Sequence, residues 1–185
     1  MDLPPFPGPR GRADVSVRPA VADDAEAIAR VQVVTWRTAY REVLPAAVLD
    51  GWDDTAAADT WRRSIATPPS PAHRVLVAQE RDVTVGLAAC APAEDATGLG
   101  LLEIVALAVE PRWGRRGHGS RLLAAVADTA RDLSAPGLTM WLATADAVTA
   151  RFLTGAGWAH DGATRTLDAG DALVPQERWH SWFDE

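Results

Sequence analysis

The chain has 185 residues, 48% of them hydrophobic, and a formal net charge of -7. This length and apolar content suit one globular domain with a sizeable core, and no apolar run is long enough to span a membrane. The acidic balance argues against nonspecific binding of nucleic acid. All 18 basic residues are arginine, which excludes Walker-type phosphate loops and Schiff-base enzymes because both need a lysine.

The N-terminal residues and the cysteine content of the chain predict one intracellular domain. Residues 1–14 are rich in proline and glycine and lack the apolar core of an export signal. We expect them to form a disordered leader before a single domain at residues 15–185. Cys90 is the single cysteine and cannot form an internal disulfide, so we expect a cytoplasmic location. The histidines lack metal-ligand spacing, and we expect no metal.

The first part of the chain predicts a short strand and two helices. Residues 15–18 alternate as a strand does and stop at a proline. The helix after Asp23 places four apolar side chains on one arc, those of Ala27, Ile28, Val31 and Val34. Asp53 or Asp54 then caps a second helix.

The remaining segments predict strands and helices in a mixed order. Polar turns separate three strands that predict an antiparallel meander, at residues 73–79, 83–91 and 101–109. After an amphipathic helix that ends at Pro136, the pattern predicts a strand at 138–143, a helix at 147–154 and strands near 164–167 and 177–182. The strand–helix–strand unit implies one parallel pair, so the fold class is α+β or mixed α/β.

The most informative segment, residues 103–123, reads EIVALAVEPRWGRRGHGSRLL. An apolar run ends at Pro111, a loop rich in Arg and Gly follows, and an amphipathic helix begins. Free N–H groups at a helix start attract anions, and basic residues oppose the helix dipole unless an anion lies among them. The segment therefore predicts an anion site made of Arg112, Gly114, Arg115, Arg116, Gly117, His118, Gly119 and Ser120. The alternative is a solvated surface loop.

This segment resembles the acyl-CoA-binding motif of the GNAT superfamily of N-acyltransferases. The matching residues are Val109-x-Pro111, Arg116-Gly117-His118-Gly119-Ser120 and the pair Leu122-Leu123. Residues 17–45 resemble the opening strand and helix of the family, and Arg151-Phe152 with Gly157-Trp158 resembles its closing motif, so the resemblance covers about residues 15–182. It implies a mostly antiparallel mixed sheet of about six to seven strands, with a central splayed parallel pair and about four flanking helices.

The resemblance also implies how the chain would bind acetyl-CoA as its cosubstrate. Backbone groups of Leu107, Ala108 and Val109 would pair with the pantetheine arm, and the loop from Gly114 to Ser120 would hold the pyrophosphate through its N–H groups. His118 is then expected to present its backbone. Asp146 stands where many members have an asparagine that touches the cofactor arm, and Trp36 and Tyr40 flank the expected acceptor site.

Two residues are candidates for the chemistry of acyl transfer. Glu103 is the one charged residue of LLEIVALAV, a position where some GNAT members carry a general base; the alternative is a salt-bridged or edge-facing carboxylate. In a regular strand it would share a face with Val105, Leu107 and Val109. A backbone N–H freed near Val109 could donate to the oxyanion.

The sequence as a whole predicts an enzyme that transfers acetyl from acetyl-CoA to a primary amine within a ternary complex. Leu153 is a departure, since many members have there a tyrosine that serves as an acid. A catalytically silent acyl-CoA-binding module therefore stays the alternative. A site for ATP or NAD is disfavoured because Leu122 breaks the Gly-x-Gly-x-x-Gly spacing. The acceptor is a small-molecule or peptide amine, and the Trp-rich C-terminal strand is compatible with a homodimer.

Overall fold

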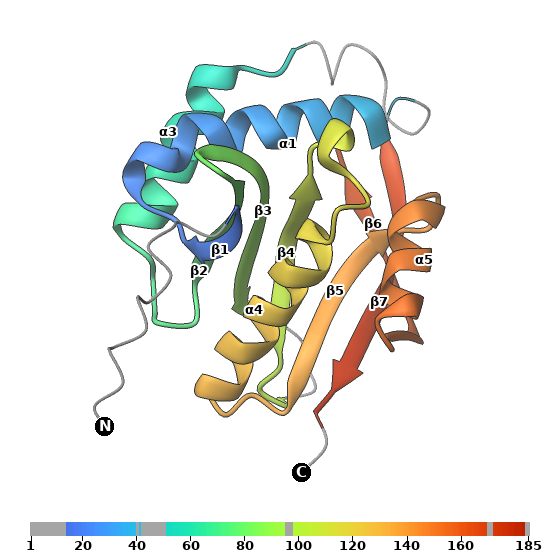
Figure 1. Cartoon of the computed structure of the whole chain (residues 1–185). Coiled ribbons are helices and arrows are strands. Elements are labelled where there is room, and N and C mark those ends of the chain that lie inside the picture. Colours follow the sequence, from blue (N-terminus) through green and yellow to red (C-terminus); the bar gives the residue numbers. More distant parts are fainter. Residues whose placement is uncertain (1–13, 40, 42–50, 95–97, 170–171, 184–185) are drawn as a thin grey trace, which may run out of the picture.

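The computed structural model describes residues 14–39, 41, 51–94, 98–169 and 172–183, so most of the expected leader and Tyr40 lie outside the described residues (Figure 1). Seven strands form one sheet in the order β1-β2-β3-β4-β5-β7-β6. They are β1 (Val15–Pro19), β2 (Arg74–Glu80), β3 (Val83–Pro92), β4 (Leu102–Val109), β5 (Gly137–Ala143), β6 (Ala159–Asp168) and β7 (Leu173–Trp182). The helices are α1 (Ala25–Ala39), α3 (Asp54–Ala66), α4 (His118–Asp132) and α5 (Ala147–Gly155), with 3-10 turns η1 (Ala22–Asp24) and η2 (Pro111–Trp113).

The sheet is antiparallel except for one central pair. Strands β1 to β4 form an antiparallel meander, β4 lies parallel to β5, and β7 lies antiparallel between β5 and β6. The predicted α+β class, the meander and the parallel pair are confirmed. Strands β6 and β7 are longer than predicted. The segment AHDGATRTLD of β6 has no apolar alternation and is exposed at nine of ten positions, so the period-2 signal is missing there.

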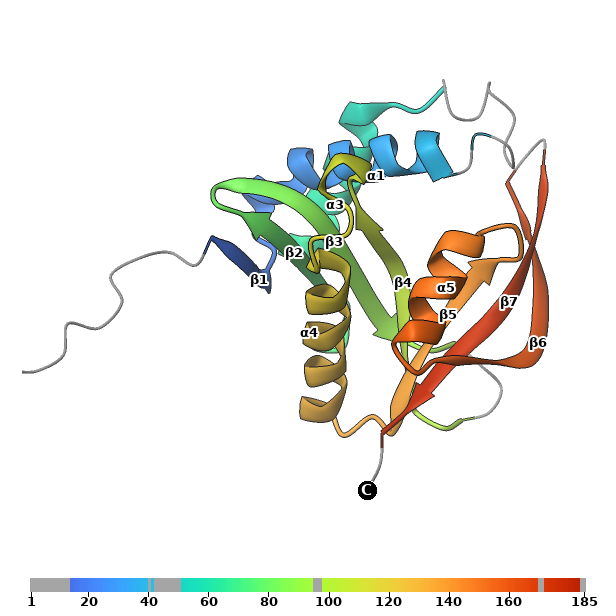
Figure 2. The same cartoon turned by 45° about the vertical axis from the view of Figure 1, so that its right-hand side comes forward.

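Helices cover both faces of the sheet, as Figure 1 and the turned view in Figure 2 show. On one face α4 and α5 bury Leu122, Val126 and Leu153 against the sheet. On the other face α1 and α3 pack Ile28 and Trp61 against it. The central strands therefore have an apolar core on each side, which fixes their position relative to the loops at their ends.

Local signals set the starts of two helices. The carboxylate of Asp53 accepts the N–H groups of Thr55 and Ala56, and it caps α3 as predicted. Helix α1 buries Ile28 and Val31 as predicted, but farther along the helix Val33 is buried and Val34, the last residue of the predicted arc, is exposed. A run of Val-Gln-Val-Val offers two helical arcs of similar apolarity, and packing against the sheet selects between them.

Candidate active site

Strands β4 and β5 part immediately after they meet. Their parallel pairing is limited to Leu102 with Leu138 and Glu103 with Thr139. Beyond Glu103 the two strands diverge toward the upper end in Figure 1, so the predicted splayed pair is confirmed. Glu103 therefore lies at the point where the strands separate.

A cavity of about 560 Å³ lies at the splayed end of the sheet. Four structural parts line it: the end of α1, the end of β4 with η2, the loop and start of α4, and the start of α5. The predicted site residues in this lining are Trp36, Leu107, Ala108, Val109, Gly114, Arg115, Gly117, His118, Gly119, Ser120 and Asp146. The residues that the sequence analysis missed are Thr35, Thr38, Ala39, Pro111, Trp113, Val148, Thr149 and Phe152.

Some of these missed residues carried a signal in the sequence. Thr35 precedes Trp36 on α1, and Phe152 belongs to the closing motif. Val148 carried no signal, because an exposed valine on a short helix is unremarkable.

The backbone of β4 presents alternate residues to the splayed gap. Glu110 N–H donates to Val85 O on β3 at 2.9 Å, so the residue before it, Val109, directs its N–H and C=O to the opposite side. By the same alternation Leu107 faces the gap and Ala108 faces β3. Two of the three residues predicted to pair with an extended ligand thus have backbone groups on the gap side.

The loop before α4 directs backbone N–H groups outward from the helix start. Gly117 adopts a left-handed φ of 81° and the helix begins at His118, while Arg121 N–H donates to Gly117 O at 3.1 Å. The N–H groups of the first helical residues have no hydrogen-bond acceptor within the helix. His118, Gly119 and Ser120 all line the cavity, so this end of the cavity is suited to an anion.

The three loop arginines have different surroundings. Arg115, whose φ is 62°, lines the cavity. Arg112 bonds the buried carboxylate of Glu110, and Arg116 bonds Glu80 at 3.0 Å. Arg112 and Arg116 are not part of the cavity lining among the described residues. Arg115 and the backbone therefore supply the positive potential inside the cavity.

A bulge in β4 changes the face on which Glu103 lies. The register shifts between Ala89 and Cys90 on β3, so Val105 is the extra residue on β4 and is 56% exposed. Ile104 packs on the α4 face, whereas Ala106 packs on the α1 face. The prediction that Glu103 shares a face with Leu107 and Val109 is therefore wrong, because it assumed a regular strand.

The half-buried Glu103 lies on the same side of the sheet as α1, since its neighbours in sequence, Leu102 and Ile104, pack on the α4 face. Glu103 is not among the described residues that line the cavity. Glu103 lies near the start of β4, and Ile104, Val105 and Ala106 separate it from Leu107, the first residue of this strand in the cavity lining.

Asp146 and Leu153 have structural roles on α5. The carboxylate of Asp146 caps the helix by accepting Thr149 N–H at 2.9 Å and the Thr149 hydroxyl at 2.7 Å. Leu153 is fully buried in the core on the α4 face. The position at which the family tyrosine was expected therefore packs inward in this chain.

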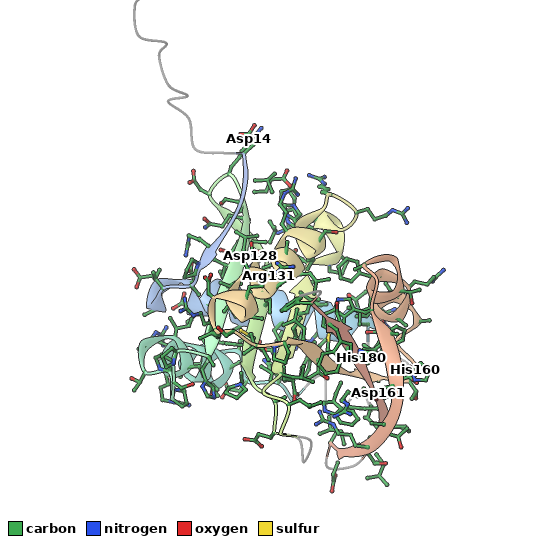
Figure 3. The ribbon with its side chains drawn as sticks, turned by 90° about the horizontal axis from the view of Figure 1, so that it is seen from below. Asp14, Asp128, Arg131, His160, Asp161 and His180 are labelled. Carbon is green, nitrogen blue, oxygen red and sulfur yellow. The ribbon has the colours of Figure 1, made fainter. Side chains whose placement is uncertain are left out.

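The described residues contain no group of three or more His, Cys, Asp or Glu side chains that could hold a metal ion. His160, Asp161 and His180 lie together on β6 and β7 (Figure 3), where Arg178 binds Asp161 at 2.7 Å.

Within the described part of the chain, none of the helices is long and apolar enough to cross a membrane.

Comparison with known families identifies the family that has this splayed mixed sheet beside a helix N-terminus. The model of the acetyltransferase (GNAT) family matches residues 33–154. The chain belongs to this family. No curated protein sequence matches the chain significantly.

Solved structures show the same fold at low sequence identity. A GCN5-related N-acetyltransferase from Rhodopseudomonas palustris is 18% identical, with a TM-score of 0.71 over 95% of this chain and 100% of that one. The ribosomal-protein-alanine N-acetyltransferase from Brucella melitensis is 18% identical, with a TM-score of 0.68 over 91% and 99%. The PaiA N-acetyltransferase from Thermoplasma acidophilum, solved with coenzyme A, is 12% identical, with a TM-score of 0.66 over 92% and 100%.

Proposed function

We propose that the protein transfers an acetyl group from acetyl-CoA to a primary amine by direct attack in a ternary complex. The observation that carries this proposal is the cavity where β4 leaves β5, with the N-terminus of α4 at one end. The thioester of acetyl-CoA would supply the activated acyl group. Backbone N–H groups of His118, Gly119 and Ser120 would hold its phosphates, and Arg115 would add positive charge.

The strand edge at the gap would bind and polarise the acyl arm. Backbone groups of Leu107 and Val109 face the gap, so they can pair with the amides of an extended ligand. Val109 N–H would stabilise the oxyanion that develops on the carbonyl oxygen during attack. Trp36 on α1 would form part of the acceptor site, because it lines the cavity on the side of the sheet where Glu103 lies. Tyr40, which lies outside the described residues, would flank the same acceptor site.

Glu103 would act as the general base, through water, for the attacking amine. It lies where the strands part, on the α1 side of the sheet, and it is outside the cavity lining, so a water molecule must relay the proton. The leaving thiolate needs no dedicated acid, because a cysteine-like thiol has a pKa of about 8.5. This suits a chain in which Leu153 is buried in the core.

The Glu103→Gln variant tests the assignment of the base. We expect kcat to fall by about 10²- to 10⁴-fold, the usual contribution of general acid–base catalysis, while the Kd for acetyl-CoA changes less than about twofold because Glu103 lies outside the cavity. The assay measures free CoA thiol with a panel of amines: a polyamine, an aminoglycoside, amino acids and peptides. Glu26→Gln is the matched control, since that carboxylate is exposed at the start of α1.

Leu153 favours a second candidate, a silent module that binds acyl-CoA without turnover. Under that candidate the wild-type protein would bind acetyl-CoA and release no CoA with every amine of the panel. Unchanged turnover in Glu103→Gln would instead support the assignment as an acetyltransferase and exclude Glu103 as its general base.

A further inference from the structure

One carboxylate, that of Glu80, joins strand β2 to the loop that precedes α4. Its Oε1 lies 3.0 Å from a guanidinium nitrogen of Arg116, and its Oε2 lies 3.0 Å from Nε2 of His118. Glu80 is the last residue of β2 and pairs with Val83 across the turn to β3. The loop is therefore tied to the sheet at its last basic residue and at the first residue of the helix.

The ring of His118 is fully enclosed. Its side chain has an exposed fraction of 0%, and its Nδ1 is buried without a hydrogen-bond partner among the described residues. Of the two tautomers of the neutral ring, the one with hydrogen on Nε2 donates to Glu80 and leaves no buried N–H unpaired. The contact with Glu80 is thus the polar interaction that holds this ring in place.

Arg116 is fixed by contacts at three points. Its guanidinium binds Glu80, and it lies 4.9 Å from the ring centre of Trp113, which lines the cavity. Its carbonyl oxygen accepts a hydrogen bond from Arg121 at 3.0 Å. Arg116 does not line the cavity in the described structure, and Glu80 neutralises its charge. Its contacts therefore shape the backbone that precedes Gly117.

We propose that Glu80 is a positioning residue for the anion-binding loop. By holding Arg116 and His118 together it orders the loop before the ligand arrives, so the N–H groups of Gly119 and Ser120 point into the cavity. Ordering in advance lowers the entropic cost of binding. A carboxylate near an anion site would otherwise weaken binding, and here Arg116 offsets its charge. This inference rests on the proposed function, since the anion is taken to be a phosphate of acetyl-CoA.

The Glu80→Gln variant tests the proposal because it keeps the shape of the side chain. A glutamine offers one acceptor oxygen, and its NH₂ group would face the other of the two donors. We expect the calorimetric Kd for CoA and the KM for acetyl-CoA to rise about tenfold, the effect of one charge-assisted hydrogen bond. The kcat at saturating acetyl-CoA should stay within about twofold, because Glu80 does not touch the reacting atoms.

A double-mutant cycle adds a second measurement. Arg116→Gln removes one of the two contacts at an exposed position, and it should raise the Kd for CoA about threefold. In the Arg116→Gln background, Glu80→Gln should have a smaller effect than in the wild type, because the two residues act through one network. Arg116→Gln also tests the proposal by itself if Glu80→Gln fails to fold.

The control is Asp128→Asn, which breaks an exposed ion pair with Arg131 toward the other end of α4 (Figure 3). Its affinity for CoA should equal that of the wild type. A Glu80→Gln protein that unfolds at lower temperature but binds CoA with wild-type affinity would overturn the positioning role. If Glu80→Gln does not fold, wild-type affinity in Arg116→Gln would overturn it equally. Failure of the wild-type protein to bind CoA would instead contradict the proposed function itself.

Discussion

Arg30 on α1 and Glu110 at the end of β4 form an ion pair at 2.6 Å. Arg30 also donates to Thr84 O at 2.8 Å, so it connects α1 to both β3 and β4 just before the chain enters the loop. The Glu110 side chain is only 7% exposed, and a buried carboxylate is costly without partners. This contact therefore fixes the end of β4 against α1.

We predict that Arg30→Ala lowers the free energy of unfolding by about 2 kcal/mol, because it removes a charged hydrogen bond from a buried carboxylate. Arg62→Ala on α3 is the matched control, since its partners Glu26 and Asp59 are exposed, and it should cost less than about 0.5 kcal/mol. Urea denaturation of both variants measures the difference. Equal losses in the free energy of unfolding would show that the Arg30–Glu110 pair contributes no more than an exposed ion pair.

Gly86 on β3 should tolerate no side chain. A Cβ there would lie 2.9 Å from Ala108 O and 3.2 Å from Leu122 Cδ1. We expect Gly86→Ala to destabilise the fold by about 1–3 kcal/mol through overpacking between β4 and α4. Gly155→Ala is the control, because a Cβ there meets nothing within 4 Å. Thermal unfolding should show a lower midpoint for Gly86→Ala alone.

Arg115 should contribute more than Arg112 to binding of the cosubstrate. Arg115 lines the cavity, whereas Arg112 bonds Glu110 outside it. We predict that Arg115→Ala raises the calorimetric Kd for CoA about tenfold through loss of one charge-assisted contact. Arg112→Ala should raise it less than about threefold. A larger rise in the Kd for CoA in Arg112→Ala than in Arg115→Ala would place the phosphates on the other side of the loop.

Asp24 should make stability depend on pH in the acid range. Burial alone would raise its pKa, but hydrogen bonds from Arg18 and from Val21 N–H hold the pKa of Asp24 below its ordinary value. A carboxylate whose pKa is lower in the folded state stabilises the protein above its unfolded pKa of about 3.9, and this stabilisation is lost as pH falls through the folded value.

Asp24→Asn should therefore be less stable than the wild type at pH 7, and the difference should shrink as the pH falls below about 4. Denaturant unfolding at several pH values measures this convergence. The exposed neighbour Asp23 supplies the control, Asp23→Asn. Parallel pH curves for the wild type and Asp24→Asn would contradict the linkage.

Local patterns were sufficient to predict that the Arg- and Gly-rich loop leads into a helix. The glycines and arginines between Val109 and Leu122 are adjacent in sequence, and they leave the helix N-terminus in the same place whatever the rest of the fold does. The three-strand meander was predictable for the same reason, since short polar turns separate its strands. The splayed parallel pair came from the resemblance to the family.

Features that depend on distant partners could not be predicted. The face of Glu103 is set by a bulge at Val105, which arises from the register against β3. His118 bonds Glu80, 38 residues earlier in the chain, and no local pattern indicates that pairing. The ion pair of Arg116 with Glu80 could not be predicted either, because it depends on the fold bringing β2 beside the loop.

Titration of acetyl-CoA into the purified protein by calorimetry, with ATP as the comparison ligand, tests the central claim most directly. The cavity beside the N-terminus of α4 predicts saturable binding of acetyl-CoA at one site and no binding of ATP. A folded protein that binds neither ligand, or that binds ATP as tightly as acetyl-CoA, would contradict the assignment of this cavity to acetyl-CoA.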